Sequence, residues 1–432
     1  MNKKTKKKEV TKKETYDEGP LREIKIRVVG AGGGGGSIIS GISSNLKKVL
    51  FAAANTDSHA LYEATKKKKI KGFNFGEKIT GGLGTGMDPH LGKEAANQSI
   101  AEIKELLKGQ DITILVASLG GGTGSGALPV FASIARQTGS IVYGVLTLPF
   151  SFEGEKKMKI AKKAIKDTAP YLNAVTILPN DKIFKVVDKN TPLKEALSKM
   201  NDMLSFNLEG LIETINDTGL INIDFADVRT ILEKRKGTRK LTYLSTVDAD
   251  LQDGADEIVR KAVSNPLYPY KVEDARGVLF NITGGKDIGL MDVASISEKI
   301  SEHTNGKAKI IVGITQKNNF KDRVRIALLA TGCATDLFSE ELGERKQLPP
   351  KKKKPVKVEK KVKEKPVKKI EKEKIPKEVE KDPLPKEEVR RNALDVKNNL
   401  DSEERKILEE EEKWEKPSFL RSLIFRDWVS ST

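Results

Sequence analysis

Two aspartates, Asp224 and Asp227, stand three residues apart in the segment "NIDFADVR". Within the first turn of a helix this spacing puts both carboxylates on one side, where they could polarise a water molecule or bind a cation. Acidic residues at a helix N-terminus can also cap free backbone N–H groups and balance the helix dipole. The pair therefore predicts either a site that handles water or a cation, or a helix cap.

Three glycine-rich segments indicate a second kind of chemistry, the binding of phosphate groups. They read "GAGGGGGS", "GGLGTGMDP" and "GGGTGSG", and they occupy residues 30–37, 81–89 and 120–126. The first contains G-x-G-x-x-G between a predicted strand and a predicted helix, which aims backbone N–H groups at a phosphate. Asp57 follows the next predicted strand, where a dinucleotide-binding fold places the acid that binds ribose.

The number of these segments separates two kinds of nucleotide site. A dinucleotide fold uses one such loop, whereas three loops can hold a chain of phosphates from several sides. The hydroxyls of Thr123 and Ser125 can add hydrogen bonds or orient a metal-bound water. The sequence has no G-x-x-x-x-G-K-[ST] motif, which argues against a Walker-type NTPase. Because carboxylates repel a triphosphate, we expect Asp224 and Asp227 to meet it at the reacting γ-phosphate or to come from another subunit.

Apolar runs and glycine stops predict the elements that carry these loops. The strands and helices predicted in the first part of the chain are, in order, residues 24–30, 37–46, 49–57, 111–119, 126–139 and 140–148. Their alternation is typical of an α/β fold with a doubly wound parallel sheet. A long helix over residues 193–218 follows, and shorter strands with a helix after it predict a smaller α+β domain.

Charge and composition predict where the folded domains and the disordered segments of the chain begin and end. The chain has 432 residues and a formal net charge of +17, with lysine concentrated near both ends. Residues 351–389 mix Lys, Glu and Pro with almost no aromatic residues, so they cannot bury a core and should form a disordered tether. We predict a disordered basic tail (1–23), a first domain (24–192), a central helix (193–218) and a second domain (219–343). A disordered charged linker (344–389) and a C-terminal tail (390–432) follow.

The composition also argues against several classes of protein. The single cysteine cannot form an internal disulfide, which fits a reducing compartment. No run reaches about 18 apolar residues, so we expect no membrane span. Lysine-rich ends predict weak, salt-sensitive attraction to polyanions, so nucleic-acid binding is an alternative, although we expect no specific nucleic-acid partner. The three histidines show no metal-ligand spacing, and we expect no protein metal site.

Two of these motifs resemble signatures of one known family. "GGGTGSG" is similar to the signature of the tubulin/FtsZ GTPase family, and "NIDFADVR" is similar to the synergy loop of its FtsZ branch. The resemblance covers about residues 24–332. It implies a tubulin-like fold and a self-assembling GTPase of the bacterial division ring, which polymerises head to tail in the cytoplasm at mid-cell. The nucleotide would be GTP or GDP, with Mg²⁺ that no dedicated cage of protein ligands holds.

The resemblance also assigns roles to individual residues. It implies that the nucleotide is bound by Gly33, Gly34, Gly35, Gly36, Ser37, Asn55, Asp57, Gly84, Thr85, Gly86, Gly122, Thr123, Gly124, Glu153, Lys157, Asn180 and Asn201. The glycine-rich loops would hold the phosphates, Glu153 the ribose, and the last two asparagines the sugar and guanine. The catalytic residues Asn222, Asp224 and Asp227 would act on the GTP of the neighbouring subunit.

Three positions depart from the family pattern. Ser37 stands where the family has Asn, Lys157 where it has Arg, and Leu197 where a Phe stacks on guanine. Lysine keeps the charge but lacks the bidentate fork of arginine, and leucine offers no aromatic face. A divergent paralogue that binds GTP and forms filaments but hydrolyses poorly is therefore an alternative. A Rossmann-type oxidoreductase is another, but it explains neither the third glycine-rich segment nor the aspartate pair.

The C-terminal segment "EKPSFLRSLIFRDW" resembles the tail peptide of the family through Pro417, Phe419, Leu420 and Arg421. A short apolar anchor on a long tether is suited to docking in the groove of a partner. Without a partner these apolar side chains would be exposed to water. The resemblance implies a division-ring partner or membrane tether such as FtsA.

Overall fold

The computed structural model describes residues 24–342, apart from 43–45, 47–48, 67–68, 189, 234–239, 305, 307 and 336. The predicted basic tail, charged linker and C-terminal tail, with its peptide around Phe419, lie outside the described residues. Within the described ranges, every helix is too short or too polar to cross a membrane.

The first sheet has six parallel strands in the order β3-β2-β1-β4-β5-β6. Its strands are β1 (Ile26–Ala31), β2 (Val49–Asn55), β3 (Ile70–Asn74), β4 (Ile112–Ser118), β5 (Ile141–Leu148) and β6 (Ala174–Pro179). The central strands are nearly continuous runs of Ile, Val, Leu and Ala and are buried. Burial on both faces is expected of a parallel sheet that is covered by helices.

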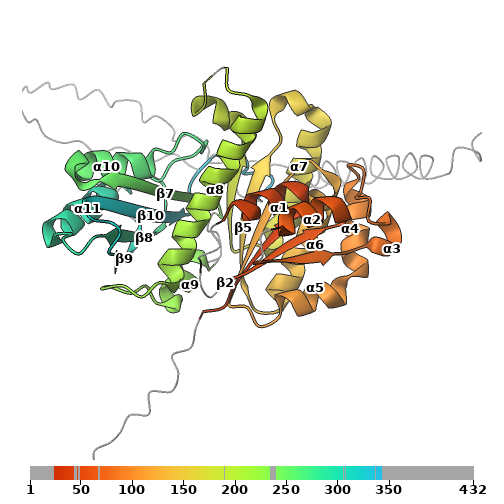
Figure 1. Ribbon diagram of the computed structural model, residues 1–432, viewed down its shortest axis with the longest axis horizontal. Helices are drawn as coiled ribbons and strands as arrows, with labels where there is room; N and C mark the ends of the chain where they lie inside the picture. The colour runs from red at the N-terminus through yellow and green to blue at the C-terminus, as the bar shows by residue number, and fades with distance from the viewer. Residues whose placement is uncertain are drawn as a thin grey trace, which may run out of the picture. The chain divides into compact units, whose positions relative to one another are not determined.

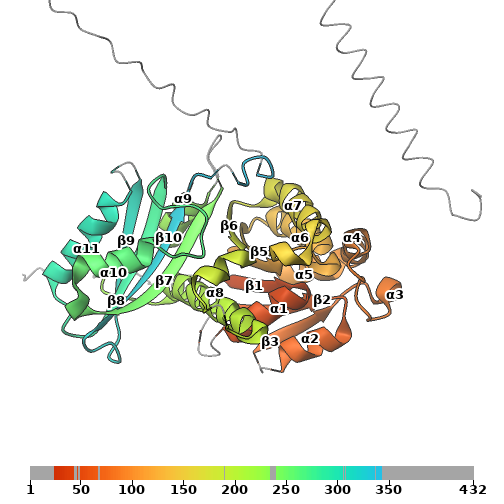
Figure 2. The same ribbon diagram turned by 90° about the horizontal axis from the view of Figure 1, so that it is seen from above.

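Helices cover both faces of this sheet (Figures 1 and 2). Seen from above, α1 and α2 lie on one side, and α5, α6 and α7 lie on the other (Figure 2). The helices of this part are α1 (Gly32–Gly41), α2 (Ser58–Thr65), α3 (Glu77–Thr80), α4 (Pro89–Gln98), α5 (Ile100–Leu107), α6 (Gly122–Gln137) and α7 (Glu155–Thr168). Three 3-10 helices join them, η1 (Ser151–Glu153), η2 (Ala169–Tyr171) and η3 (Asn180–Lys185).

Two predicted helix starts are wrong, and both errors have the same cause. We expected helices from residues 37 and 126, after the glycine clusters, but α1 begins at Gly32 and α6 at Gly122. Glycine has a low helix propensity, so the clusters were expected to be loops. Close packing overrides that propensity, because a Cβ on Gly35 of α1 would lie 2.4 Å from the Val116 carbonyl oxygen, and one on Gly122 of α6 would lie 2.7 Å from the backbone of Asp88.

The long helix α8 (Leu193–Asn216) runs between the first sheet and a second one (Figure 1). The second sheet has the order β7-β10-β8-β9, with β10 antiparallel to both neighbours and β9 parallel to β8. Its elements are α9 (Phe225–Leu232), β7 (Thr242–Asp250), η4 (Leu251–Asp253), α10 (Gly254–Val263), β8 (Gly277–Gly284), α11 (Leu290–Glu302), β9 (Lys309–Gln316) and β10 (Arg323–Thr331). The predicted fold class, a doubly wound parallel sheet with a central helix and a smaller α+β domain, is confirmed.

Candidate nucleotide site and acidic loop

The strand order of the first sheet locates a crevice for a ligand. The chain runs outward from β1 through β2 to β3 and then returns to β4 on the other side of β1. Doubly wound sheets bind ligands at such a reversal, beside the carboxyl ends of the strands. The first glycine-rich segment follows β1 and the third follows β4, so both reach this crevice.

Close packing explains why glycines occupy this crevice. Gly32 has a φ of +72°, which disfavours other residues, and a Cβ there would lie 3.0 Å from the backbone nitrogen of Gly124. A Cβ on Gly34 would lie 2.4 Å from the Ser118 side chain. The two segments therefore pack against each other and bring two helix N-termini, those of α1 and α6, to the same place.

The glycines of the first segment have different surroundings. Gly33 is exposed, with open space where its Cβ would lie. Gly35 and Gly36 are buried; a Cβ on Gly35 would lie 2.4 Å from the Val116 carbonyl oxygen, and one on Gly36 3.1 Å from Ala64. Close helix packing thus accounts for the last two glycines, whereas the first can approach a phosphate.

A cavity of about 480 Å³ opens beside these segments. Six of the predicted binding residues line it, namely Gly34, Ser37, Glu153, Lys157, Asn180 and Asn201. Ser118, Thr147 and Pro149, at the ends of β4 and β5, line it as well and were not predicted. Its volume suits a drug-sized or nucleotide-sized ligand. The cavity therefore joins the phosphate-binding loops to the residues expected to contact sugar and base.

Three threonine hydroxyls form a cluster under the glycine-rich segments. Thr123 Oγ1 lies 2.6 Å from Thr56 Oγ1 and 3.2 Å from Thr85 Oγ1. All three side chains are buried. Thr85 and Thr123 were predicted site residues, but Thr56 was missed, although its position between Asn55 and Asp57 at the end of β2 could have indicated it. The cluster therefore fixes the end of β2 relative to the second and third glycine-rich segments.

The remaining predicted residues of this edge hold the loops in shape. Asn55 Oδ1 accepts hydrogen bonds from the backbone N–H groups of Thr56, at 2.9 Å, and Asp57, at 3.2 Å. Asp57 caps α2 by accepting a hydrogen bond from the N–H of Ala60 at 2.9 Å. Gly84 donates its N–H to the Thr56 carbonyl, whereas Gly86 has open space around it. None of these residues lines the cavity, and their expected contact with the nucleotide stays a prediction.

Ser125 has a structural role in the third segment. Its hydroxyl accepts a hydrogen bond from the N–H of Gly120 at 2.9 Å, so it closes the turn between β4 and α6. Because the oxygen only accepts this bond, the hydroxyl proton stays available, and the expected donor role toward a phosphate or a metal-bound water stays a prediction. In the next turn, a Cβ on Gly122 would lie 2.7 Å from the backbone nitrogen and oxygen of Asp88. The signature segment is therefore held by contacts on both sides.

The opposite end of the cavity carries charged and amide groups. Lys157 Nζ lies 2.7 Å from Glu153 Oε2, and Glu153 Oε1 accepts the N–H of Phe150 at 2.8 Å. The lysine at the position of the usual arginine is thus already paired with the predicted ribose-binding glutamate. Asn180 and Asn201 line the same end from η3 and α8. This end offers acceptors and amide groups that suit ribose hydroxyls and a base edge.

An aromatic side chain that the sequence did not point to faces this end. Phe152 lines the cavity together with Leu197, is 65% exposed and stacks on Phe150 with ring centroids 4.8 Å apart. Phe184 contacts the same Phe150 ring at 5.8 Å but does not line the cavity. The cavity therefore contains an aromatic face even though Leu197 replaces the expected Phe.

The acidic loop lies far from this cavity in the same chain. Asn201 sits near the start of α8, and Asn216 ends it, 15 residues later. At a rise of about 1.5 Å per residue, the helix separates the two by about 22 Å. Asp224 and Asp227 follow that far end, at the start of α9 (Figure 1). The structure therefore does not bring the catalytic candidates to the nucleotide residues of their own chain.

The two carboxylates do not serve as helix caps. Asp224 is the N-cap residue of α9, but its side chain makes no capping hydrogen bond. Among the described residues, neither Asp224 nor Asp227 has a side-chain hydrogen bond or ion pair. Asn222 differs, because its Oδ1 accepts the N–H of Gly219 at 2.6 Å and shapes the loop. Both carboxylates are thus free to act on a group brought from outside, while Asp227, in the first turn of α9, also balances the helix dipole.

The site offers oxygen donors that suit a magnesium–nucleotide complex. The hydroxyls of Thr85 and Thr123 and the carboxylate of Asp57 adjoin the glycine-rich segments. Mg²⁺ prefers oxygen ligands, keeps several waters and is often bound with substrate phosphates. In the described part of the chain, no three His, Cys, Asp or Glu side chains form a metal cluster.

Comparison with known proteins decides between the GTPase and oxidoreductase alternatives. The model of the Tubulin/FtsZ family, GTPase domain, matches residues 25–188, and that of the FtsZ family, C-terminal domain, matches residues 242–334. The chain belongs to the FtsZ family. The strand order alone could not decide this, because dinucleotide-binding sheets share it. As an FtsZ-family protein, the chain has a GTPase domain that binds GTP and GDP, and the oxidoreductase alternative is rejected.

Relatives and solved structures agree with the family. The chain is 35% identical over 320 residues to the cell division protein FtsZ of Coxiella burnetii, covering 73% of this chain and 80% of that protein. Against the same protein of Haemophilus influenzae it is 35% identical over 338 residues, covering 73% and 79%. An FtsZ dimer of M. jannaschii has a TM-score of 0.66 and 33% identity, covering 72% of this chain and 89% of the other. CetZ2 from Haloferax volcanii, 22% identical with a TM-score of 0.62 and covering 74% of this chain and 96% of that one, supports the fold alone.

Proposed function

We propose that this FtsZ-family protein is a cell-division GTPase that polymerises head to tail and hydrolyses GTP where two subunits meet. The observation that carries the proposal is the position of two unpaired carboxylates, Asp224 and Asp227, at the far end of α8 from the nucleotide cavity. Its curated relatives are named cell division proteins, and one solved relative is an FtsZ dimer. A catalytic group that cannot reach the nucleotide of its own chain must act on that of a neighbour.

Exposed apolar side chains support a contact between these two ends. Leu83, in the second glycine-rich segment, is 87% exposed. Leu220 and Ile221, in the acidic loop, are 67% and 51% exposed. Apolar side chains in a subunit contact lose their exposure to water when the partner arrives, which favours association. Head-to-tail stacking would cover Leu83 of one subunit and the acidic loop of the next in the same step.

Each part of the site then has a role in hydrolysis. Backbone N–H groups at the starts of α1 and α6 bind the phosphates, and the one hydroxyl proton that the bonds among Thr56, Thr85 and Thr123 leave unused is donated to a phosphate oxygen. Asp224 and Asp227 of the next subunit orient the attacking water and accept its proton. Mg²⁺ bound together with GTP would neutralise part of the negative charge of the phosphates. Because water activation needs the second subunit, turnover depends on assembly.

Sedimentation with GTP and with GDP, read together with phosphate release, tests this proposal. We expect a pellet with GTP and much less with GDP, and turnover per subunit that rises steeply with protein concentration. Full turnover per subunit at concentrations where nothing sediments would contradict hydrolysis between subunits. A pellet with GTP but without phosphate release would instead identify the poorly hydrolysing paralogue.

The aromatic face in the cavity gives a prediction about guanine binding. We propose that Phe152 stacks on the base in place of the Phe that Leu197 replaces. The variant Phe152→Leu should bind GTP about fivefold more weakly, since an aromatic stack contributes about 1 kcal/mol. Phe184→Leu is the matched control, because Phe184 packs on the same Phe150 ring outside the cavity. Equal losses in the two variants, measured by nucleotide titration, would argue against stacking by Phe152.

The C-terminal tail extends the proposal beyond the described residues. We propose that Pro417, Phe419, Leu420 and Arg421 dock in a partner of the division ring or a membrane tether such as FtsA. The chain would then work in the cytoplasm at the mid-cell ring. The resemblance of "PSFLR" to the family's tail peptide supports this part of the proposal.

A further inference from the structure

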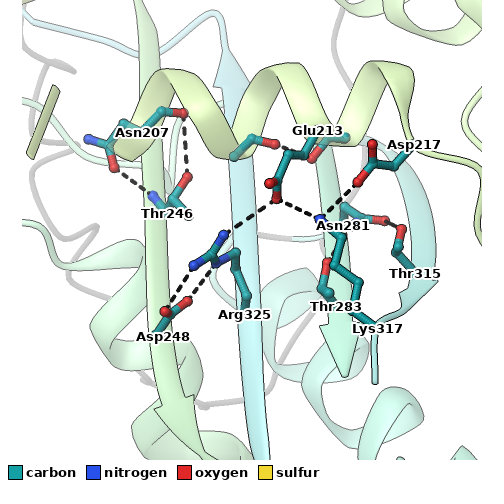
Figure 3. A network of polar contacts seen from close by, with 12 residues as sticks. Asn207, Glu213, Asp217, Thr246, Asp248, Asn281, Thr283, Thr315, Lys317 and Arg325 are labelled. Carbon is teal, nitrogen blue, oxygen red and sulfur yellow. Dashed lines mark hydrogen bonds and ion pairs between the residues drawn. The ribbon is translucent and has the colours of Figure 1, made fainter. Parts of the chain in front are cut away.

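A network of ion pairs joins the end of α8 to the second sheet (Figure 3). Lys317, the residue after β9, lies 2.8 Å from Asp217 and 3.1 Å from Glu213 through its Nζ atom. Arg325 on β10 lies 3.4 Å from the same Glu213 and forms two bonds with Asp248, at 2.7 and 3.0 Å. The network therefore ties the last turn of α8 and its C-cap residue to β10, to β7 and to the residue that follows β9.

These charges are only partly shielded from water and are paired with one another. Lys317 is 27% exposed, and its two partners Glu213 and Asp217 are 23% and 38% exposed. Burial lowers the pKa of the Lys317 ammonium, but the bonds to Asp217 and Glu213 outweigh burial, so the pKa lies above its usual value. Lys317 thus stays charged, and its ammonium group is held by two carboxylates, Glu213 in the last turn of α8 and Asp217 at its C-cap.

The same strand also holds the acidic loop by its backbone. The N–H groups of Leu220 and Ile221 donate to the Ile314 carbonyl at 2.8 and 3.2 Å, and the Ile314 N–H donates to Ile221 at 3.0 Å. A Cβ on Gly219 would lie 2.1 Å from the Ile314 carbonyl oxygen, so the loop lies directly against β9. The loop is therefore fixed at two points of β9, by backbone bonds at Ile314 and by the Lys317 side chain.

We propose that Lys317 is a positioning residue for the acidic loop, holding it through Asp217 in the orientation in which its carboxylates act on the GTP of the next subunit. This inference rests on the proposed function. Asp217 begins the loop, and Asp224 follows it by seven residues. If the ion pair is lost, the backbone hydrogen bonds at Ile314 remain, but Asp217, where the loop leaves α8, is no longer held by Lys317. A displacement of about 1 Å at a reacting group can lower a rate by up to about 100-fold.

The variants Lys317→Met and Asp217→Asn test the inference from both sides of the pair. Each should lower phosphate release per sedimented subunit about tenfold, while the GTP concentration at half-maximal rate stays within about twofold. Lys317→Arg should keep most of the turnover, because arginine retains the charge and the donors. Asp217→Asn leaves Lys317 with Glu213, so it provides a second measurement if Lys317→Met folds poorly.

A control on another helix separates this role from the general effect of removing a lysine that bridges two carboxylates. Lys299 on α11 bridges Asp256 and Glu302, each at 3.2 Å, and is 34% exposed, whereas these two partners are 84% and 58% exposed. Lys299→Met should leave turnover per sedimented subunit unchanged. An equal loss in Lys299→Met, or no rescue by Lys317→Arg, would overturn the positioning role.

A double variant shows whether Lys317 acts through the loop. If it does, Lys317→Met combined with Asp227→Ala should release phosphate no more slowly than Asp227→Ala alone, because the loop is already inactive. Additive losses would overturn the inference. The outcome for Asp227→Ala alone distinguishes the two proposals: unchanged turnover there defeats the proposed function. Collapse there with full turnover in Lys317→Met and Asp217→Asn defeats only the positioning role.

Discussion

The variant Asp227→Ala is expected to form filaments with GTP but to release phosphate at least about 100-fold more slowly per assembled subunit. The carboxylate of Asp227 has no hydrogen bond or ion pair among the described residues, and its interaction with the dipole of α9 contributes less than about 1 kcal/mol, so its loss should leave the fold intact. It also lies outside the nucleotide cavity, so GTP binding should not change. Only the step that needs a proton acceptor beside the γ-phosphate should be affected.

A matched acid on the same helix provides the control for this variant. Glu233 follows α9 and pairs with Arg229, at the end of the helix that points away from the acidic loop. Glu233→Ala should keep full turnover per assembled subunit. Phosphate release and sedimentation are measured on the same samples, so that a loss of assembly is not read as a loss of catalysis. Unchanged turnover in Asp227→Ala, or an equal loss in Glu233→Ala, would exclude catalysis by this carboxylate.

The residue pattern predicted β1, β2, β4 and β5, whose residues are mostly buried, but it missed β6 and the partly exposed edge strand β3. Runs such as "DITILVASL" have few alternatives, since a parallel strand between two helical layers must be apolar throughout. The helix starts at Gly32 and Gly122 were missed for a different reason. Their cause is contact between segments distant in the sequence, such as that between Gly122 and Asp88, and no local propensity records such a contact.

Those residues of the site that belong to short contiguous motifs could be predicted from the sequence. The glycine-rich segments and the aspartate pair could be found because each forms a short pattern with a known physical use. Phe152 could not be found in this way, because it shares the cavity with Leu197, which is far away in the chain. The position of Thr56 between two predicted residues indicated the site, but its hydrogen bond to Thr123 could not be foreseen. The Lys317–Asp217 pair is also hidden, since 100 residues separate its members. Side chains that hold a loop in place from a distant part of the chain form no pattern of spacing that the sequence could reveal.

The second large effect is expected for Gly122→Ala, which should abolish GTP binding and destabilise the first domain. A Cβ at this position would lie 2.2 Å from Thr85 Oγ1 and 2.7 Å from both the backbone nitrogen and oxygen of Asp88. The hydroxyl could rotate away, but the backbone of Asp88 begins α4 and cannot move without shifting that helix. We expect the free energy of unfolding to fall by about 3 kcal/mol, at the upper end of the effects of overpacking.

The loss of binding should exceed what the loss of stability explains. Moving Gly122 displaces the start of α6, where the helix N-terminus meets the phosphates, and it also separates Thr123 from Thr56 and Thr85. Nucleotide titration at a temperature where the variant is folded should therefore detect no GTP binding.

The neighbouring Gly121 offers the control for stability. It has an extended backbone with φ −90° and ψ 173°, and no atom lies within 4 Å of the place where its Cβ would be. Gly121→Ala should therefore unfold at the same denaturant concentration as the parent chain, although its Cβ lies at the edge of the nucleotide cavity. If Gly122→Ala were as stable as Gly121→Ala and still bound GTP, the close approach of α4 and α6 could not be what requires glycine there.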